Sequence, residues 1–461
     1  MPVRTMLIKG GTLVSESGSK KGDLIIAGEV IKAQGEPGSF NDLEIDEVLD
    51  ASGMLVLPGL IDPHVHFIAP FMGTQTIHDY YTGTVAALHG GVTTVITFST
   101  QPKGGSLIQN LALHEASAQG KALIDWSMHA ILLDATPKTL SEIPELINAG
   151  VPTYKCFTTY KHADRMMDDE GLLAVLEATA THNGMLMVHC EADSILNYNT
   201  KRLLDNGDID YKFFPQSRPR SAENESIRRI VALMKEVEAP VYIVHTSTAE
   251  SVGIIQQARE QNLQIHSETC THYLVLTEEV YTRENGGLFS CSPPLRRQQD
   301  VNVLWQAAAD GRIEVVSTDD AGLPTQDRIR VAEGRFDKMP NGMPGIEPRL
   351  VMLYTEGIAK GRIDLPRLVQ LTSANPARLF GLFPRKGHLS PGADADIVIY
   401  DPNVAWTISA AKHHMNTDFS PFEGREVIGR VDTVISRGEI VLRDEQILAK
   451  PGRGERLIRK L

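Results

Sequence analysis

One pattern repeats along the chain from residue 55: a short run of apolar and β-branched residues is followed by an amphipathic stretch. Several amphipathic stretches, such as DEGLLAVLEATATHNG, close with Gly or Asn, which commonly cap helices. Nearly continuous apolar strands that alternate with helices are typical of a parallel sheet covered by helices. The apolar runs are LVLPGLIDPHVHF (55–67), GVTTVITFS (91–99), IDWSMHAIL (124–132), GVPTYKCF (150–157), GMLMVHCE (184–191), PVYIVHTS (240–247), NLQIHSE (262–268) and RIEVVSTDD (312–320).

Eight such units predict an α/β fold, a (β/α)8 TIM-type barrel over residues 55–387. A doubly wound open sheet is the alternative, but no Gly-x-Gly-x-x-Gly follows the first strand. Residues 1–54 and 388–450 hold short strands joined at glycines, and neither end looks able to form a core alone. We therefore expect both ends to pair into one small β-sandwich domain. The basic tail, residues 451–461, has no strand pattern and is either solvated or an arm at a subunit interface.

Polar residues interrupt the apolar strands at their final positions. His64 and His66 close the first run, and the two-residue period of a strand turns both imidazoles to one side. In a (β/α)8 barrel the chemistry sits at the carboxyl ends of the strands. Burying so many ionisable groups costs several kcal/mol each unless something compensates them, and divalent metal does so. The sequence therefore predicts a metal centre built from His64, His66, Lys155, His189, His245 and Asp319.

Lys155 is the unusual member of this set, because an ammonium repels cations. Burial beside positive charge lowers the pKa of a lysine and leaves a neutral amine, which can add CO2. The resulting carbamate is an anion with two oxygens, able to bridge two metal ions. The competing interpretation is a lysine paired with an acidic neighbour, but the segment TYKCF contains no acid.

Composition excludes some classes of partner. The chain has 461 residues, and 45 basic against 58 acidic residues give a net charge of −13, which argues against nucleic acid and anionic membranes. No apolar run approaches the roughly 18–20 residues of a membrane helix, and we expect no signal peptide. The four cysteines form no C-x-x-C pair, which favours reduced thiols in the cytoplasm.

Longer motifs point to a family. They are DPHVHF, YKCFTTYK, MVHCEAD, SRPRSAENESIRR, HTSTAES, ETCTHYL, CSPPLR, PNGMPGIEPRL and LTSANPARLFGLFPRKGHLSPGADADIVIYDP. Over nearly its whole length the chain resembles the hydantoinase/dihydropyrimidinase family, cyclic amidases of the amidohydrolase superfamily. The resemblance implies a hydrolase that opens the cyclic amide of 5-substituted hydantoins or dihydropyrimidines to N-carbamoyl amino acids. It also implies a homotetramer, with a dimer as the alternative.

The resemblance implies roles for individual residues. Two divalent ions, most plausibly Zn2+, would share a bridging hydroxide; His64, His66 and Asp319 would hold one ion, His189 and His245 the other, and carboxylated Lys155 would bridge them. Asp319 would carry the proton from the hydroxide to the departing nitrogen, and Tyr160 would stabilise the oxyanion. Ser292 and Asn341 would bind the cyclic amide, largely through main-chain groups.

Two positions bear on specificity. Dihydroorotases typically carry Arg directly after His-x-His, whereas Phe67 stands here, which favours an uncharged or aromatic ring substituent. We expect the loops 67–77 and 157–168 to shape the choice of substrate, with Phe67, Met72 and Phe157 as candidate pocket walls and packing at the barrel edge as the alternative. The family usually has His after the last Asp, whereas this chain has Asp320. We expect this carboxylate to tune substrate specificity by lowering the affinity for anionic substrates, to shift the pKa of Asp319, or to point away.

Other functions stay open at this point. An allantoinase or dihydroorotase type of cyclic amidase is the nearest alternative. Some relatives are non-catalytic scaffolds, but those lack several of the ligands that this chain keeps. A one-metal, deaminase-like amidohydrolase would have no need of Lys155.

Overall fold

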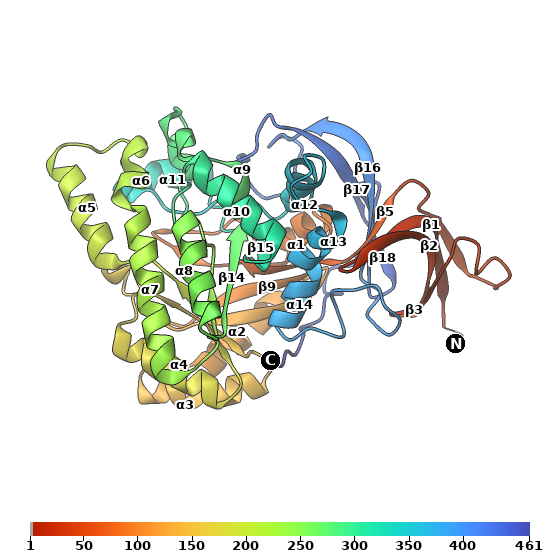
Figure 1. The fold of residues 1–461 in the computed structure, drawn as a ribbon, viewed down its shortest axis with the longest axis horizontal. Coiled ribbons are helices and arrows are strands. Elements are labelled where there is room, and N and C mark those ends of the chain that lie inside the picture. The colour runs from red at the N-terminus through yellow and green to blue at the C-terminus, as the bar shows by residue number, and fades with distance from the viewer. Residues whose placement is uncertain (1–2) are drawn as a thin grey trace.

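Eight parallel strands form a barrel in the central part of the chain, in a computed structural model that describes residues 3–461 (Figure 1). Neighbours in the sheet follow chain order, and a bridge between Val65 and Asp320 joins its first and last edges. The barrel prediction is confirmed, and the doubly wound alternative is wrong. The strands are β6 (Leu60–Val65), β9 (Val92–Thr100), β10 (Asp125–Ile131), β11 (Thr153–Phe157), β12 (Met185–His189), β13 (Val241–Ile243), β14 (Ile265–Cys270) and β15 (Val315–Ser317).

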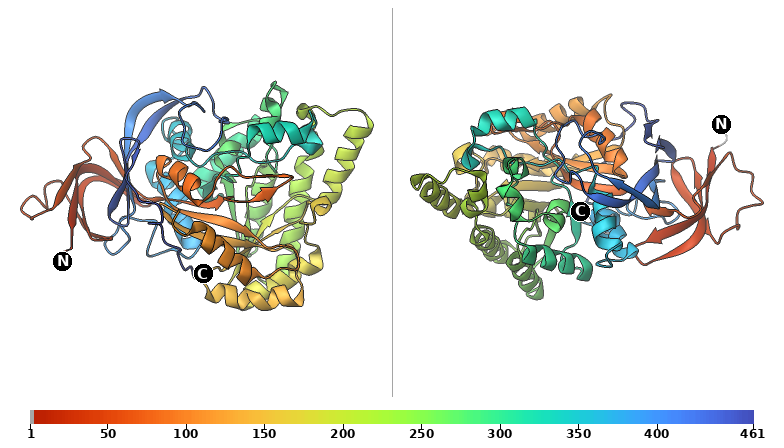
Figure 2. Two further views of the ribbon diagram at one scale, coloured as in Figure 1. Left: turned by 180° about the vertical axis from the view of Figure 1, so that it is seen from behind. Right: turned by 90° about the horizontal axis from the view of Figure 1, so that it is seen from above.

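Helices cover the outside of the barrel (Figures 1 and 2). They begin where the sequence supplies capping side chains: Asp168 accepts from the Gly171 amide, and Thr248 from the Ser251 amide. No helix within residues 3–461 is long and apolar enough to cross a membrane. The helices are α1 (Tyr80–His89), α2 (Leu107–Ala118), α3 (Pro137–Asn148), α4 (Asp169–Thr181), α5 (Asp193–Asp205), α6 (Phe214–Ser217), α7 (Arg220–Val237), α8 (Ala249–Glu260), α9 (Thr271–Val275), α10 (Gln298–Asp310), α11 (Thr325–Ala332), α12 (Arg349–Leu353), α13 (Leu365–Val369) and α14 (Asn375–Leu379).

The two ends of the chain pair beside the barrel, as predicted (Figure 2). Their strands form one continuous nine-stranded sheet in the order β19-β18-β17-β16-β5-β1-β2-β3, with β4 paired to β1, rather than two separately bonded sheets. One core cluster, including Ile8, Leu24, Val56 and Ile397, packs strands from both ends together. The strands are β1 (Thr5–Ser15), β2 (Gly18–Ala27), β3 (Val30–Gly35), β4 (Glu47–Asp50), β5 (Leu55–Pro58), β16 (Ile397–Thr407), β17 (Glu426–Ser436), β18 (Glu439–Arg443) and β19 (Gln446–Ile447).

The run 55–67, predicted as one strand, is divided at Gly59. β5 pairs with β1 and β16 in the terminal sheet, while β6 opens the barrel. A Cβ at Gly59 would lie 2.2 Å from Thr93 Oγ1 and 2.9 Å from Asp396 Cβ, so only glycine fits between the two sheets. The hydrogen bonds of β5 place this strand in the terminal sheet. We therefore propose that the boundary between the two domains lies at Gly59 instead of residue 55.

The tail 451–461 packs against the barrel of its own chain. The Leu457 amide donates to the Trp126 carbonyl at 2.7 Å. Arg459 is fully buried, and its guanidinium donates to Ser127 Oγ and Thr153 Oγ1, both at 2.8 Å. A solvated tail is therefore wrong, and the interpretation of the tail as an arm at a subunit interface stays a prediction.

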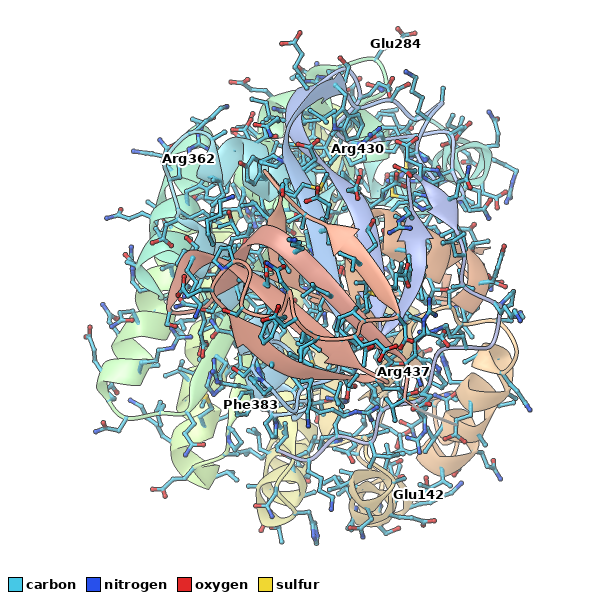
Figure 3. All side chains as sticks on the ribbon, turned by 90° about the vertical axis from the view of Figure 1, so that its right-hand side faces the viewer. Glu142, Glu284, Arg362, Phe383, Arg430 and Arg437 are labelled. Carbon is cyan, nitrogen blue, oxygen red and sulfur yellow. The ribbon has the colours of Figure 1, made fainter. Side chains whose placement is uncertain are left out.

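A buried cluster of charges joins the barrel to the terminal sheet. Lys386 Nζ lies 2.9 Å from Asp125, 3.0 Å from Asp394 and 2.6 Å from Asp396. Arg437, at the edge of the sheet in Figure 3, pairs with Asp125 at 3.1 Å. Asp125 begins β10 of the barrel, whereas Arg437 follows β17 and the other three residues precede β16, so the cluster fixes how the two domains meet.

Lys386→Met should lower the free energy of unfolding by about 3–5 kcal/mol, because it leaves three clustered carboxylates without their shared cation. Equilibrium denaturation measures the change. The control is Lys360→Met, which removes an exposed pair with Glu356 and should cost about 0.5 kcal/mol or less. Equal effects of the two substitutions would contradict the role assigned to the cluster.

Candidate functional site

Three of the predicted ligands meet in one group at the rim of the barrel. His64 Nε2 and His66 Nε2 each lie 3.1 Å from Asp319 Oδ1. Their candidate ligand atoms all lie within 4.8 Å of one another. Lys155 Nζ lies 2.9 Å from His64 Nε2, so the lysine from β11 adjoins the same group.

The other two histidines form a second group beside the first. His189 Nδ1 lies 2.9 Å from His245 Nε2, and the ring centroids of His64 and His245 are 5.6 Å apart. Lys155, His189 and His245 are all nearly fully buried. The structure thus brings together six side chains that span 255 positions of the sequence, from His64 to Asp319.

Buried carboxylates hold two of the rings in place, and the sequence analysis missed both. Glu268 forms a hydrogen bond with His64 Nδ1 and accepts another from Tyr242 at 3.1 Å. Glu191 lies 2.8 Å from His189 Nε2. Each carboxylate binds the nitrogen on the far side of its ring, which leaves the other nitrogen facing the cluster. Glu268 interrupts a predicted strand just as the ligands do, so the same signal could have found it.

The donor set fits divalent cations. Burial lowers the pKa of His66 to about 4, so its imidazole is neutral, which is the form that binds metal. Burial also lowers the pKa of Lys155 to about 8, although Asp319 and Glu268 oppose the shift. Burial would raise the pKa of Asp319, but the charges and hydrogen bonds of His64 and His66 together lower it well below its usual value and keep the carboxylate ionised. Burial and Lys155 would lower the pKa of His64, but the adjacent carboxylates of Glu268 and Asp319 raise it. Imidazole nitrogens and ionised carboxylates can share one or more cations.

Backbone strain accompanies the site. Tyr160, His245 and Asp319 have positive φ values of 65°, 40° and 47°. Residues other than glycine hold this left-handed conformation at a cost of about 1–3 kcal/mol, and such residues cluster where function requires them. The surrounding fold therefore stabilises a backbone conformation at these three residues that is unfavourable for residues other than glycine.

A pocket opens onto the cluster and contains most of the predicted substrate contacts. Tyr160 and Phe157 line it, and burial raises the pKa of the Tyr160 hydroxyl, so this group is a proton donor. Ser292 and Asn341 line the same pocket, next to the Tyr160 hydroxyl. Within residues 3–461, Ser292 Oγ and Asn341 Oδ1 are buried and have no hydrogen-bond partner. Unpaired buried polar atoms at a pocket wall are suited to binding a polar ligand.

Phe67 is not on the pocket wall. Its ring packs against Gly83 and Tyr80 of α1, with a ring centroid distance of 5.9 Å to Tyr80. His66 faces the cluster, and the alternation of side chains turns the next residue into the layer between barrel and helices. The interpretation of Phe67 as a substrate contact is therefore wrong.

Asp320 also points away from the pocket. Its carboxylate is buried and accepts from the amides of Gly345 at 2.8 Å and Ile346 at 2.9 Å. The residue fixes the loop after β15 to the segment that precedes α12. Asp320 does not line the pocket, so the predicted contact with the substrate is wrong and the side chain points away. An effect of Asp320 on the pKa of Asp319 stays a prediction.

Two pocket residues lie in the loops that the sequence analysis expected to shape the pocket, although neither residue was named there, whereas the candidate Met72 is not among the residues that line the pocket. Phe71 lies in a small hairpin, β7 (Pro70–Phe71) and β8 (Thr74–Gln75), and its ring centroid is 5.9 Å from that of Tyr160. Arg165 comes from the loop after β11 and lines the same pocket. The backbone path of a loop decides which of its side chains reach the pocket. The hydrophobic periodicity of the sequence does not predict that path.

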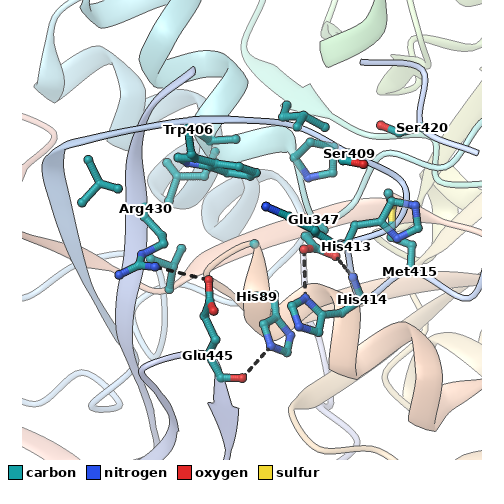
Figure 4. Close-up of a pocket in the computed structure, with 18 of the residues that line it drawn as sticks. His89, Glu347, Trp406, Ser409, His413, His414, Met415, Ser420, Arg430 and Glu445 are labelled. Carbon is teal, nitrogen blue, oxygen red and sulfur yellow. Dashed lines mark hydrogen bonds and ion pairs between the residues drawn. The ribbon is translucent and has the colours of Figure 1, made fainter. Parts of the chain in front are cut away.

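A second cavity lies between the barrel and the terminal sheet (Figure 4). His414 Nδ1 pairs with Glu347 at 3.1 Å, and Arg430 pairs with Glu445 at 3.4 Å. Trp406 covers one side. None of the six predicted ligands lines this cavity, so it is separate from the site described above.

Comparison with known proteins adds to this geometry. Residues 55–441 match the model of the amidohydrolase family. The chain is 39% identical to a D-hydantoinase of Geobacillus stearothermophilus, over 98% of this chain and 96% of that protein. It is 37% identical to a D-phenylhydantoinase of Escherichia coli, over 99% and 98%. The structure of a dihydropyrimidinase from Brevibacillus agri NCHU1002 superposes with a TM-score of 0.96 at 38% identity, covering 99% of each chain. This chain belongs to the amidohydrolase family, in its hydantoinase/dihydropyrimidinase branch.

Proposed function

We propose that this protein is a metal-dependent hydrolase that opens the cyclic amide ring of 5-substituted hydantoins or dihydropyrimidines. The products are N-carbamoyl amino acids. The observation that carries the proposal is the convergence of six ionisable side chains beside a pocket with unpaired polar atoms. The names of the relatives, hydantoinases and a dihydropyrimidinase, support the substrate class.

The metal centre that we propose holds two divalent ions, most plausibly Zn2+. His64, His66 and Asp319 would hold one ion and His189 and His245 the other, with carboxylated Lys155 between them. When bound, the ions supply Lewis acidity and lower the pKa of water. The lowered pKa of Lys155 leaves more of the neutral amine that adds CO2.

Protein groups supply the remaining chemistry. The Tyr160 hydroxyl, which stays protonated, would donate to the carbonyl oxygen as negative charge develops there. Asp319, which stays ionised, would accept a proton from the attacking water and deliver it to the departing ring nitrogen. Ser292 and Asn341 would hold the cyclic amide against Tyr160.

Assembly and location are further proposals. The homotetramer, with a dimer as the alternative, rests on the resemblance to the family, and light scattering would test it. A cytoplasmic location rests on the cysteines: in the described chain all four are buried and free.

A ring-opening assay tests the proposed function. The metal-loaded protein should hydrolyse hydantoin, phenylhydantoin or dihydrouracil to the N-carbamoyl product, measured by chromatography. Allantoin and dihydroorotate in the same panel represent the alternative cyclic amidases. Turnover of neither group of substrates would contradict the proposal and favour a non-catalytic scaffold.

Lys155→Ala should reduce bound metal from about two ions per chain to one or none, because the bridging anion is lost. Elemental analysis measures the metal, and labelled bicarbonate should give a carbamate carbon signal by NMR in the wild type only. Lys138→Ala, an exposed lysine of α3, is the control. Unchanged metal content in Lys155→Ala would exclude the bridge.

Tyr160→Phe should lower kcat by about 10²–10³-fold, the usual effect of removing one donor to a developing oxyanion. Metal content should stay the same, because the hydroxyl is not among the proposed ligands. Tyr198→Phe, on the exposed face of α5, provides the comparison and should retain the wild-type kcat. A Tyr160→Phe enzyme with wild-type kcat would remove Tyr160 from the mechanism.

A further inference from the structure

Arg165 brings a positive charge to the pocket wall outside the metal cluster. The other charged or ionisable side chains that line the pocket, apart from the Tyr160 hydroxyl, are the proposed ligands. The wall beside Arg165 includes the apolar residues Pro70 and Phe71. A guanidinium keeps its charge at any physiological pH, so this cation is permanent.

The loop that carries Arg165 has a fixed path. Its amide donates to the Tyr160 carbonyl at 3.2 Å, and the Met167 amide donates to the Phe157 carbonyl at 2.8 Å. A bridge between Phe157 and Met166 closes the loop on β11. Phe157, Tyr160 and Arg165 therefore face the same pocket from one closed segment.

The charge of Arg165 is not balanced by the protein. Its Nη2 donates to the Pro70 carbonyl at 3.1 Å, and its guanidinium carbon lies 5.3 Å from the centre of the Phe71 ring. Among the residues that the structure describes, no carboxylate forms an ion pair with it; the neighbouring Asp164 pairs instead with Lys103, at 3.4 Å. A guanidinium has five N–H donors, so most of its donors remain available for a ligand.

We propose that Arg165 is a specificity-determining residue that binds a carboxylate on the ring substituent of the substrate. This inference rests on the proposed function and names its substrate class: cyclic amides with an anionic substituent, such as 5-(2-carboxyethyl)hydantoin. The planar guanidinium matches a carboxylate through two parallel hydrogen bonds. Phe71 and Pro70 would contact the carbon chain between the ring and the carboxylate. The expectation of an uncharged substituent, which rested on Phe67, is replaced.

The test compares two substrates of nearly the same shape that differ in charge. One is 5-(2-carboxyethyl)hydantoin, and the other is its uncharged carboxamide. In Arg165→Met the ratio of kcat/KM for the acid to that for the amide should fall about 10- to 100-fold, mainly through the KM of the acid, because charge-assisted hydrogen bonds are lost. Arg165→Lys keeps the positive charge but lacks the planar guanidinium, so its ratio should lie between those of the wild type and Arg165→Met. Lys161→Met removes the same charge from the exposed part of this loop and should keep the wild-type ratio.

The outcomes separate this inference from the proposed function. An unchanged ratio in Arg165→Met would overturn the inference and leave Arg165 as a brace for Pro70 and Phe71. A wild-type enzyme that opens the amide but prefers it strongly over the acid would also overturn the inference, while the proposed function stands. Turnover of neither hydantoin, nor of the unsubstituted ring, would instead reject the proposed function.

Discussion

The removal of water from six ionisable side chains at one rim of the barrel is the constraint on which the rest of the site depends. The chain places four imidazoles, a lysine and a carboxylate in contact with little solvent around them. Each buried charge would cost several kcal/mol alone. A neutral imidazole at His66, a lysine with a lowered pKa and the two buried carboxylates behind the rings reduce that cost, and bound cations would offset the rest.

The two ends of the barrel divide the tasks of stability and chemistry. At the carboxyl ends of the strands, three residues hold unfavourable backbone conformations around the pocket. At the opposite end, Lys386 and Arg437 join the barrel to the terminal sheet, and Arg459 ties the tail to β10 and β11. Contacts at this end therefore contribute stability, which can offset the cost of the unfavourable conformations at the end that carries the chemistry.

The pocket combines three kinds of wall. The cluster provides the proposed metal ligands, the hydroxyl and amide groups of Tyr160, Ser292 and Asn341 provide polar contacts, and Phe71 with Phe157 provides apolar surface. Arg165 adds a charge at one point of this wall. A pocket of this kind orients a polar ring through a few polar groups and selects its substituent through the remaining surface.

The sequence by itself determined the barrel, the pairing of the chain ends and the six residues of the cluster. Strand periodicity and the polar residues that interrupt strand ends are signals that can be detected locally in the sequence. Because the strands close into a barrel, the polar residues at their carboxyl ends become neighbours. The tertiary structure alone decided the division at Gly59, the burial of Phe67 and Asp320, and the presence of Arg165 in the pocket. These features depend on contacts with distant segments and on the paths of loops, for which no residue pattern along the chain provides a signal.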